Sequence, residues 1–280
     1  MIDITLGHTP DSDDAFMFYG LATGKVDSNE FRIAHVIEDI EKLNKRAVNH
    51  ELDITAISVH AYAFLKDYVI LRSGGSFGIN YGPIILAKKD FSQKELSTKT
   101  IAIPGKMTSA YLLLSLFLNN LNLNNFNVKE IPFHLIPDAI INNEVDAGIV
   151  IHEIQIAYEH LKLCKIIDLG MWWHNITNGL PVPLGINVAS NKSLTLRQIR
   201  EFDTLFKKSI IYGLNNMEET INYAMKYGRG QAQNMISKFV NMYVNDLTID
   251  MGDKGKQAIE KVFDLAIEKH ILSPFSVYFA

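Results

Sequence analysis

EVDAGIVIHE, residues 144–153, is the stretch that decides which fold the chain is expected to adopt. Small and aliphatic residues run from Ala147 to Ile151, with Asp146 before them and His152 after them. An apolar run of this length between polar residues is typical of a strand buried on both faces of a sheet, rather than of a helix. The stretch therefore predicts an α/β protein, and it raises the question of why a buried strand ends on a histidine.

His152 has two interpretations. The plainer one is that His152 and Glu153 face solvent and only end the strand. The other is that His152 is a catalytic base, because open α/β sheets bind ligands at the carboxyl ends of their strands, and a histidine pKa of about 6.5 suits proton transfer at neutral pH. A binding protein would use the same side chain only as a hydrogen-bond donor. The residues alone leave these alternatives open.

Short apolar strands alternate with helical patterns along the rest of the chain, which favours an α/β fold with largely parallel strands. The expected strands include residues 2–7, 53–58 and 100–104, and the expected helices include residues 15–23, 40–49 and 105–121. Two helix-rich stretches, 196–227 and 230–270, follow.

The stretch that contains the buried strand has an internal counterpart. NHELDITAIS (49–58) and NNEVDAGIVI (142–151) share Asn, Glu, a branched aliphatic residue and Asp at the same positions. Each combines a helix end, an acidic turn and a buried strand. Such a similarity can arise by chance between two βα units, or it can mark two related lobes that both place the end of this strand at a shared cleft.

Two extended stretches, YGPIILAKK (81–89) and GLPVPLGINVASN (179–191), are expected to carry the chain from one lobe to the other and back. Both begin with Gly and Pro, which suit bends. This path is that of two-lobe solute-binding proteins. We therefore expect a periplasmic-binding-protein-like (type II) α/β fold with a ligand cleft between the lobes. Residues 1–86 and 186–280 would form a large discontinuous lobe, and residues 87–185 a small one.

Composition excludes several classes of function. The formal charge of -4 and the dispersed 27 Lys and Arg give no basic surface for nucleic acid. Cys164 is the only cysteine, so no intrachain disulfide or cysteine-based zinc site is expected, and none of the nine histidines has a recognisable metal-ligand spacing. No apolar run approaches the about 18 residues of a membrane span and no signal peptide is recognisable, so we expect a cytoplasmic protein without membrane insertion. No cofactor is predicted, and the oligomeric state is left open.

Two further stretches could bind a small molecule. IPGKMTSAY (103–111) places Thr108 and Ser109 at the start of a helix, where hydroxyls often only cap the helix but where the free N–H groups also favour an anion. TAISVHAYAF (55–64) places Ser58 at a strand end, where it could donate to a ligand oxygen or simply form a turn.

Several stretches together resemble one family. HTPDSDDAFMFYGL, EDIEKLNKRA, LRSGGSFGINYGP, IPGKMTSAYLLLSLF, AGIVIHE and DLGMWWHNITNGLPVPLG are similar, in this order, to the 1,4-dihydroxy-6-naphthoate synthases of the futalosine route to menaquinone. The resemblance covers nearly the whole chain and is strongest from Leu71 to Gly185. It implies a bacterial lyase that converts cyclic dehypoxanthine futalosine to 1,4-dihydroxy-6-naphthoate.

The resemblance also implies roles for particular residues. His152 would be the proton acceptor, and the substrate-contacting residues would lie at one strand end and one helix start. These residues are Ala56, Ile57 and Ser58 at the strand end and Thr108, Ser109 and Ala110 at the helix start. Asp14 would be a further contact, although Asp11, Ser12 and Asp13 stand where many members have Cys, Pro and Asn.

Two alternatives accompany this interpretation. The chorismate dehydratases share the fold and the pathway, but their usual amino-terminal pattern is missing from this chain. A non-catalytic binding protein for a small carboxylate would share the fold and the helix-start anion site and would need no base. Turnover of a carboxylated naphthalenone–sugar adduct separates the enzyme from the binder.

Overall fold

The computed structural model describes residues 1–28, 30–151, 155, 158–227 and 232–280. Every structural statement below refers to these residues. In the described part of the chain no helix is both long and apolar enough to cross a membrane.

The chain divides into two compact units. Unit 1 consists of Met1–Phe77, Gly185–Lys256 and Phe275–Ala280, and unit 2 of Gly78–Leu184 and Gln257–Pro274. Each unit is built on its own sheet.

Unit 1 has a six-stranded mixed sheet in the order β2-β1-β3-β11-β4, with β5 paired to β11. Its strands are β1 (Ile2–His8), β2 (Phe31–Ile37), β3 (Ile54–Ser58), β4 (Tyr68–Ile70), β5 (Ser76–Gly78) and β11 (Val182–Ser190). β1 is parallel to both β2 and β3, whereas β11 is antiparallel to β3 and β4. The carboxyl ends of β1, β2 and β3 therefore share one edge of the sheet.

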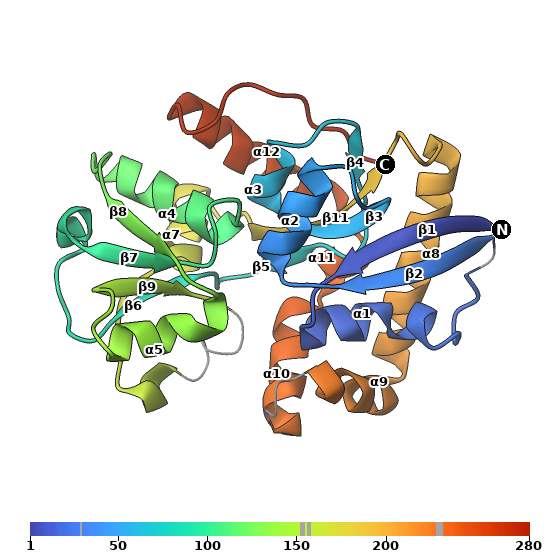
Figure 1. Ribbon diagram of the computed structural model, residues 1–280, viewed down its shortest axis with the longest axis horizontal. Coiled ribbons are helices and arrows are strands. Elements are labelled where there is room, and N and C mark those ends of the chain that lie inside the picture. Colours follow the sequence, from blue (N-terminus) through green and yellow to red (C-terminus); the bar gives the residue numbers. More distant parts are fainter. Residues whose placement is uncertain (29, 152–154, 156–157, 228–231) are drawn as a thin grey trace. The chain divides into compact units, whose positions relative to one another are not determined.

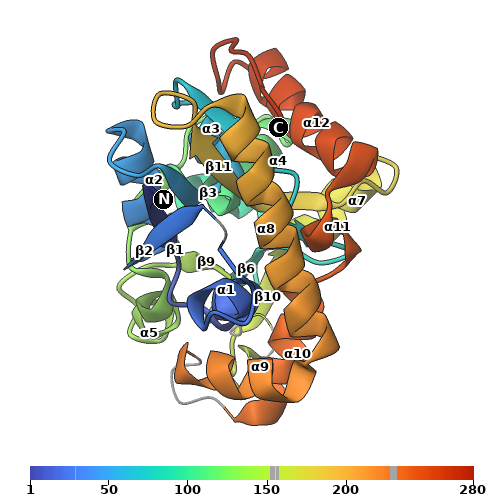
Figure 2. The ribbon, with the colours of Figure 1, turned by 90° about the vertical axis from the view of Figure 1, so that its right-hand side faces the viewer.

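Helices cover both faces of this sheet. They are α1 (Ser12–Ala22), α2 (Ile40–Val48), α3 (Val59–Tyr62), α8 (Leu196–Asn215), α9 (Met217–Ala224), α10 (Gln233–Tyr243), α11 (Asp246–Ile249) and the beginning of α12 (Gly252–Glu268). α1 packs with α8, α9 and α10 in an extended apolar core (Figures 1 and 2). α2 covers the end of β3 in a smaller cluster, through Leu43, Leu52 and Ala56.

α8 shows how the sequence produces this packing. A capping box begins the helix: the Gln198 N–H donates to Thr195 Oγ1 and the Thr195 N–H donates to Gln198 Oε1. Ile199, Phe202 and Phe206 then recur at intervals of three and four residues and are all fully buried. The helix thus presents one apolar face to α1.

Unit 2 has a five-stranded sheet in the order β10-β6-β9-β7-β8. Its strands are β6 (Ile84–Ala87), β7 (Thr100–Ile103), β8 (Asn127–Glu130), β9 (Ala147–Val150) and β10 (Cys164–Asp168). β9 is buried along its whole length between parallel β7 and antiparallel β6. The buried strand predicted from EVDAGIVIHE is therefore confirmed, and it lies in the middle of its sheet.

The helices of unit 2 include α4 (Ser109–Asn120), α5 (Ile136–Ile141) and α7 (Leu169–Ile176). α5 packs on β9 through Ile136 and Ile140. Gly148 of β9 permits this approach, because a Cβ there would lie 2.4 Å from Cγ2 of Ile136. The Trp173 side chain is completely buried and its indole N–H donates to the Pro181 carbonyl at 3.0 Å.

The two similar stretches, 49–58 and 142–151, have the same local structure. Asn49 and Asn142 each end a helix, and the next residue has a left-handed φ, 55° at His50 and 59° at Asn143. The glutamate that follows donates its N–H five residues back in both cases.

The shared aspartate makes the same contact in both stretches. Asp53 Oδ2 accepts the N–H of Thr5 at the neighbouring parallel strand, and Asp146 Oδ2 accepts the N–H of Thr100, each at 2.8 Å. The shared letters thus encode one helix–turn–strand unit in each half of the chain.

The division into units differs in two places from the lobes expected from the sequence, 1–86 with 186–280 and 87–185. β6 belongs to unit 2, because it pairs with β9 and β10. Residues 257–274, which include most of α12, also group with unit 2. Both differences depend on pairing and packing between residues far apart in the sequence.

Candidate functional site

In unit 1, the candidate site residues lie at the carboxyl ends of β1 and β3. The parallel register pairs Leu6 with Ile54 and Gly7 with Thr55. His8 and Ala56 therefore lie at the same level of the sheet, and Ile57 and Ser58 follow at its edge. Ala56, Ile57 and Ser58 are all buried.

Ser58 is held by a side chain that the sequence did not single out, Asn44 of α2. The Ser58 N–H donates to Asn44 Oδ1 at 2.9 Å, and Asn44 Nδ2 donates to Ser58 Oγ at 3.3 Å. Asn44 is completely buried. A buried amide in an amphipathic helix is stable only when it is hydrogen-bonded, and these bonds fix the end of β3.

The loop between β1 and α1 places buried carboxylates at the same edge. Asp14 Oδ2 accepts the Thr9 N–H at 2.6 Å. Burial raises the pKa of Asp14 to about 6, the Thr9 hydrogen bonds oppose this shift, and the nearby Asp11 adds to it. Asp14 is thus a carboxyl group that titrates closer to neutrality than usual, a property that is frequent in functional sites.

His8, at the end of β1, is a second residue that the sequence did not single out. Its Nε2 lies 3.1 Å from Nδ1 of His35 on β2, and its ring lies 4.9 Å from that of Phe18. Burial, with a smaller contribution from His35, lowers the pKa of His8 to about 4. His8 is therefore neutral at physiological pH and could act as a hydrogen-bonding group.

The raised pKa of Asp14 predicts a pH-dependent effect on stability. The folded protein binds the Asp14 proton more tightly than the unfolded chain does. This contribution is therefore full at pH values below the unfolded pKa near 3.8 and is lost as the pH rises through about 6. Relative to the wild type, Asp14→Asn should gain about 2–3 kcal/mol of unfolding free energy between pH 4 and pH 7.5.

Urea denaturation at a series of pH values measures this difference. Exposed Asp264 of α12 offers a matched control, because Asp264→Asn should show a difference from the wild type that does not change with pH. If the difference in unfolding free energy between Asp14→Asn and the wild type were also independent of pH, the raised pKa of Asp14 would be contradicted.

In unit 2, three predicted residues lie together at the start of α4. Thr108 caps the helix, since its Oγ1 accepts the Tyr111 N–H at 3.3 Å and donates to the Gly105 carbonyl at 2.7 Å. The Ser109 hydroxyl donates to the Leu184 carbonyl. Thr108, Ser109 and Ala110 are all buried. Both hydroxyls therefore hold the loop to the helix, and the N–H groups of the first turn are the donors suited to an anion.

His152 lies outside the described residues. The strand before it, β9, pairs in parallel with β7, and Ile101 faces Ala147 in their register. The carboxyl ends of β7 and β9 thus share one edge of the unit 2 sheet, and α4 begins shortly after β7. In unit 1, Ala56–Ser58 lie at the end of β3, and Asp14 is bonded to Thr9 just after the neighbouring β1; in unit 2, Thr108–Ala110 lie together at the start of α4.

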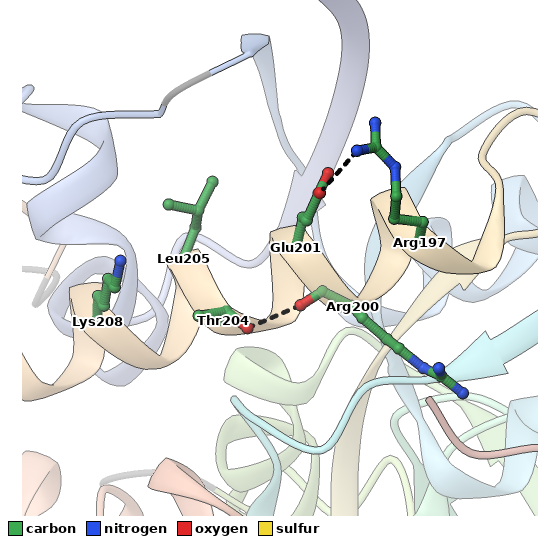
Figure 3. Close-up of a pocket in the computed structure, with 6 residues that line it drawn as sticks. All are labelled: Arg197, Arg200, Glu201, Thr204, Leu205 and Lys208. Atoms are coloured by element: carbon green, nitrogen blue, oxygen red, sulfur yellow. Dashed lines mark hydrogen bonds and ion pairs between the residues drawn. The ribbon is translucent and has the colours of Figure 1, made fainter.

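A separate surface pocket lies along α8 and is lined by Arg197, Arg200, Glu201, Thr204, Leu205 and Lys208 (Figure 3). Arg197 pairs with Glu201 at 3.4 Å, and the Thr204 hydroxyl donates to the Arg200 carbonyl. These are ordinary contacts on the solvent-facing side of α8. Among the described residues, no group of three His, Cys, Asp or Glu side chains is placed to hold a metal ion.

The fold and these strand-end edges define a class of protein, the periplasmic-binding-protein-like fold. The periplasmic aliphatic sulphonate binding protein of Escherichia coli shares it, with a TM-score of 0.67 at 14% sequence identity over 98% of this chain and 89% of that one. At this identity the likeness concerns the fold alone.

The chain belongs to the menaquinone biosynthesis family, whose pattern it matches over residues 4–268. It is 34% identical to the 1,4-dihydroxy-6-naphtoate synthase of Thermus thermophilus, over 97% of this chain and 96% of the relative. The enzyme of the same name from Streptomyces coelicolor is 30% identical, over 91% and 90%. A crystal structure of a protein from Archaeoglobus fulgidus has a TM-score of 0.90 at 43% identity, covering 96% and 98%. The expected resemblance and fold are both confirmed.

Proposed function

We propose that the chain is a lyase that converts cyclic dehypoxanthine futalosine to 1,4-dihydroxy-6-naphthoate. The observation that carries the proposal is the match along nearly the whole chain to two curated relatives named for this product. A cytoplasmic location belongs to the same proposal, because the named reaction is biosynthetic.

The proposed chemistry needs a base and several donors to oxygen. Breaking down the cyclised adduct toward an aromatic ring requires removal of a proton next to a carbonyl or hydroxyl group, and aromatisation supplies driving force. His152 is the proposed proton acceptor. The buried α4 start would bind the substrate carboxylate through its N–H groups, and the edge formed by Ala56, Ile57 and Ser58 would bind a substrate oxygen.

Turnover by the purified protein tests the proposal. The cyclic substrate should give 1,4-dihydroxy-6-naphthoate, identified by its absorbance and mass, without added cofactor. Chorismate offered in a parallel reaction should be recovered unchanged, and its dehydration would instead assign the chorismate dehydratase activity.

A second candidate is a binding protein for a small carboxylate, which the shared fold with a sulphonate-binding protein favours. Calorimetry with the cyclic substrate and with its product separates the two functions. Tight retention of either compound without any turnover would favour the binding protein and overturn the proposed lyase.

The α4 start gives a prediction on binding. Replacing Thr108 with Ala removes the helix cap and its bond to Gly105, and should raise KM by about 5-fold to 30-fold, or about 1–2 kcal/mol, with kcat largely kept. Ser109→Ala should act in the same direction, through loss of the bond to Leu184.

Steady-state kinetics of Thr108→Ala and Thr108→Ser measure this effect. The Ser variant keeps the capping hydroxyl and should have a KM close to that of the wild type. Loss of turnover in Thr108→Ala with unchanged substrate affinity would assign a chemical role and contradict the positioning role.

A further inference from the structure

We infer that Asn44 sets the direction of the Ser58 hydroxyl, so that Ser58 donates its proton to a hydrogen-bond acceptor of the ligand. Asn44 is thus a positioning residue, and the ligand atom at Ser58 is one that accepts a hydrogen bond, as a carbonyl or carboxylate oxygen does. The inference deepens the proposed function and rests on the place that it gives to Ser58.

The first step is the orientation of the Asn44 amide. The Ser58 backbone N–H can only donate, and it lies 2.9 Å from one end of the amide. That end must therefore be the oxygen, and the other end, 3.3 Å from Ser58 Oγ, must be the NH2 group. The backbone of Ser58 thereby decides which way the buried amide points.

The Ser58 hydroxyl has a single proton, and the orientation of the Asn44 amide determines where it points. The Asn44 NH2 group has no lone pair to offer, so Ser58 Oγ has to accept from it. The single proton of the Ser58 hydroxyl is then directed away from Asn44. In the described part of the chain, Ser58 Oγ donates to no protein acceptor, and Ser58 is 4% exposed. A buried hydroxyl with an unused proton is suited to a ligand acceptor.

The surroundings hold Asn44 in place. Its Nδ2 also lies 3.4 Å from Glu41 Oε2, one turn earlier on α2, so both amide protons face acceptors. Asn44 is 0% exposed and sits beside Leu43, which packs on the end of β3. The amide therefore cannot rotate without leaving the Ser58 N–H unpaired in the interior.

Neutron diffraction of deuterated crystals tests the orientation directly and does not depend on the reaction. The expected result is a deuterium on Asn44 Nδ2 that faces Ser58 Oγ, and a Ser58 deuterium that points away from Asn44. A Ser58 deuterium that points toward Asn44 would overturn the inference, whatever the protein catalyses.

Kinetics with the cyclic substrate test the consequence. Asn44→Asp keeps an acceptor for the Ser58 N–H but places a second acceptor against Oγ, which turns the hydroxyl proton inward. Glu41→Gln in every variant of the series removes the carboxylate that lies 3.4 Å from this position and would otherwise oppose the new charge. We expect kcat/KM to fall by about 10-fold to 100-fold, the loss of one hydrogen bond to a charged or developing charged group. An increase in KM with unchanged kcat indicates that the ligand group at Ser58 is a carboxylate. A decrease in kcat indicates a carbonyl oxygen on which charge develops.

A double-mutant cycle separates positioning from general damage. Ser58→Ala removes the same donor, so adding Asn44→Asp to Ser58→Ala should lower kcat/KM little further. Asn187→Asp is the control, since Asn187 is also buried and donates to the Gly74 carbonyl; it should reduce stability and leave kcat/KM near the wild-type value.

The outcomes distinguish the two proposals. A wild type without turnover overturns the proposed function, and the neutron experiment then decides the role of Asn44. If the wild type is active, fully multiplicative effects of Asn44→Asp and Ser58→Ala overturn the positioning role and leave the function intact. An Asn44→Asp variant with unchanged kcat/KM does the same.

Discussion

Replacing His152 with Asn is expected to lower kcat by about 100-fold to 10,000-fold, the usual contribution of a general base. Asn keeps a polar side chain of similar reach and removes the proposed proton acceptor. Because the loss concerns the chemical step, KM and the unfolding free energy should change little. Steady-state kinetics, ligand titration and circular dichroism on the same preparation measure these three quantities.

A matched substitution controls for the chemistry of the exchange. His160, exposed eight residues further along, should tolerate replacement by Asn with its kcat unchanged. In the wild type, kcat should also fall on the acidic side as the base becomes protonated, and this limb should disappear in His152→Asn. A His152→Asn variant with near wild-type kcat would show that His152 only orients the substrate, and the base would then be sought at Asp14 or at His60, a buried residue of α3.

Local pattern predicted those features of the fold that depend on neighbours in sequence. The buried strand 147–150 was predictable, because a short, unbroken apolar run between polar ends is typical of a central strand and too short for a buried helix. The similarity between 49–58 and 142–151 was visible as identical residues, but the sequence did not show which contacts those residues make. Asp53 and Asp146 bind the N–H of residues that lie 48 and 46 positions away, and no local pattern contains such a contact.

The candidate site was predictable to a lesser degree, for a related reason. Thr108 and Ser58 occupy a helix start and a strand end, positions that sequence marks. Asn44 carries no such mark, since one amide in an amphipathic helix resembles a surface residue until β3 packs against it. Only the two hydrogen bonds to Ser58 single out Asn44, and they form only when α2 packs against β3.

The β1–α1 loop illustrates the same limit. The sequence predicted a helix from residue 15, whereas α1 begins at Ser12 with Asp11 as its N-cap residue. Asp11, Asp13 and Asp14 are all buried, although their charged side chains gave no indication of this in the sequence. Burial of carboxylates is against the usual rule, which is why the raised pKa of Asp14 had no counterpart in the sequence.

An aromatic stack between α1 and α8 supports the β1–α1 loop. Phe206 of α8 is completely buried and stacks on Phe18 of α1, with ring centroids 4.2 Å apart and 7° between the planes. Phe18 in turn contacts His8, so the stack supports the end of β1 and the helix that carries Asp14. Phe206→Ala should lower the unfolding free energy by about 3–5 kcal/mol, as burial, stacking and close packing are lost together.

Gly74 provides the reverse perturbation at the same contact. A Cβ at Gly74 would lie 2.0 Å from Cε1 of Phe206, and the φ of +74° is itself unfavourable for other residues. Gly74→Ala should therefore cost about 2–4 kcal/mol in the wild type. In Phe206→Ala the clash with the ring is removed, so the backbone strain of about 1–2 kcal/mol and the contact with Asn187 Nδ2, 2.7 Å from the new Cβ, should remain.

Urea denaturation of the two single variants and the double variant measures this coupling. The double variant should be less destabilised than the sum of the single changes by about 1–2 kcal/mol. Phe64→Ala serves as the control, because Phe64 is 48% exposed and should cost below about 1 kcal/mol. Strict additivity would mean that Gly74 is required for its φ or for the space beside Asn187, and not for the Phe206 ring. A loss below about 1 kcal/mol in Phe206→Ala would mean that α1, and the carboxyl group of Asp14 with it, is held in place by contacts other than this stack.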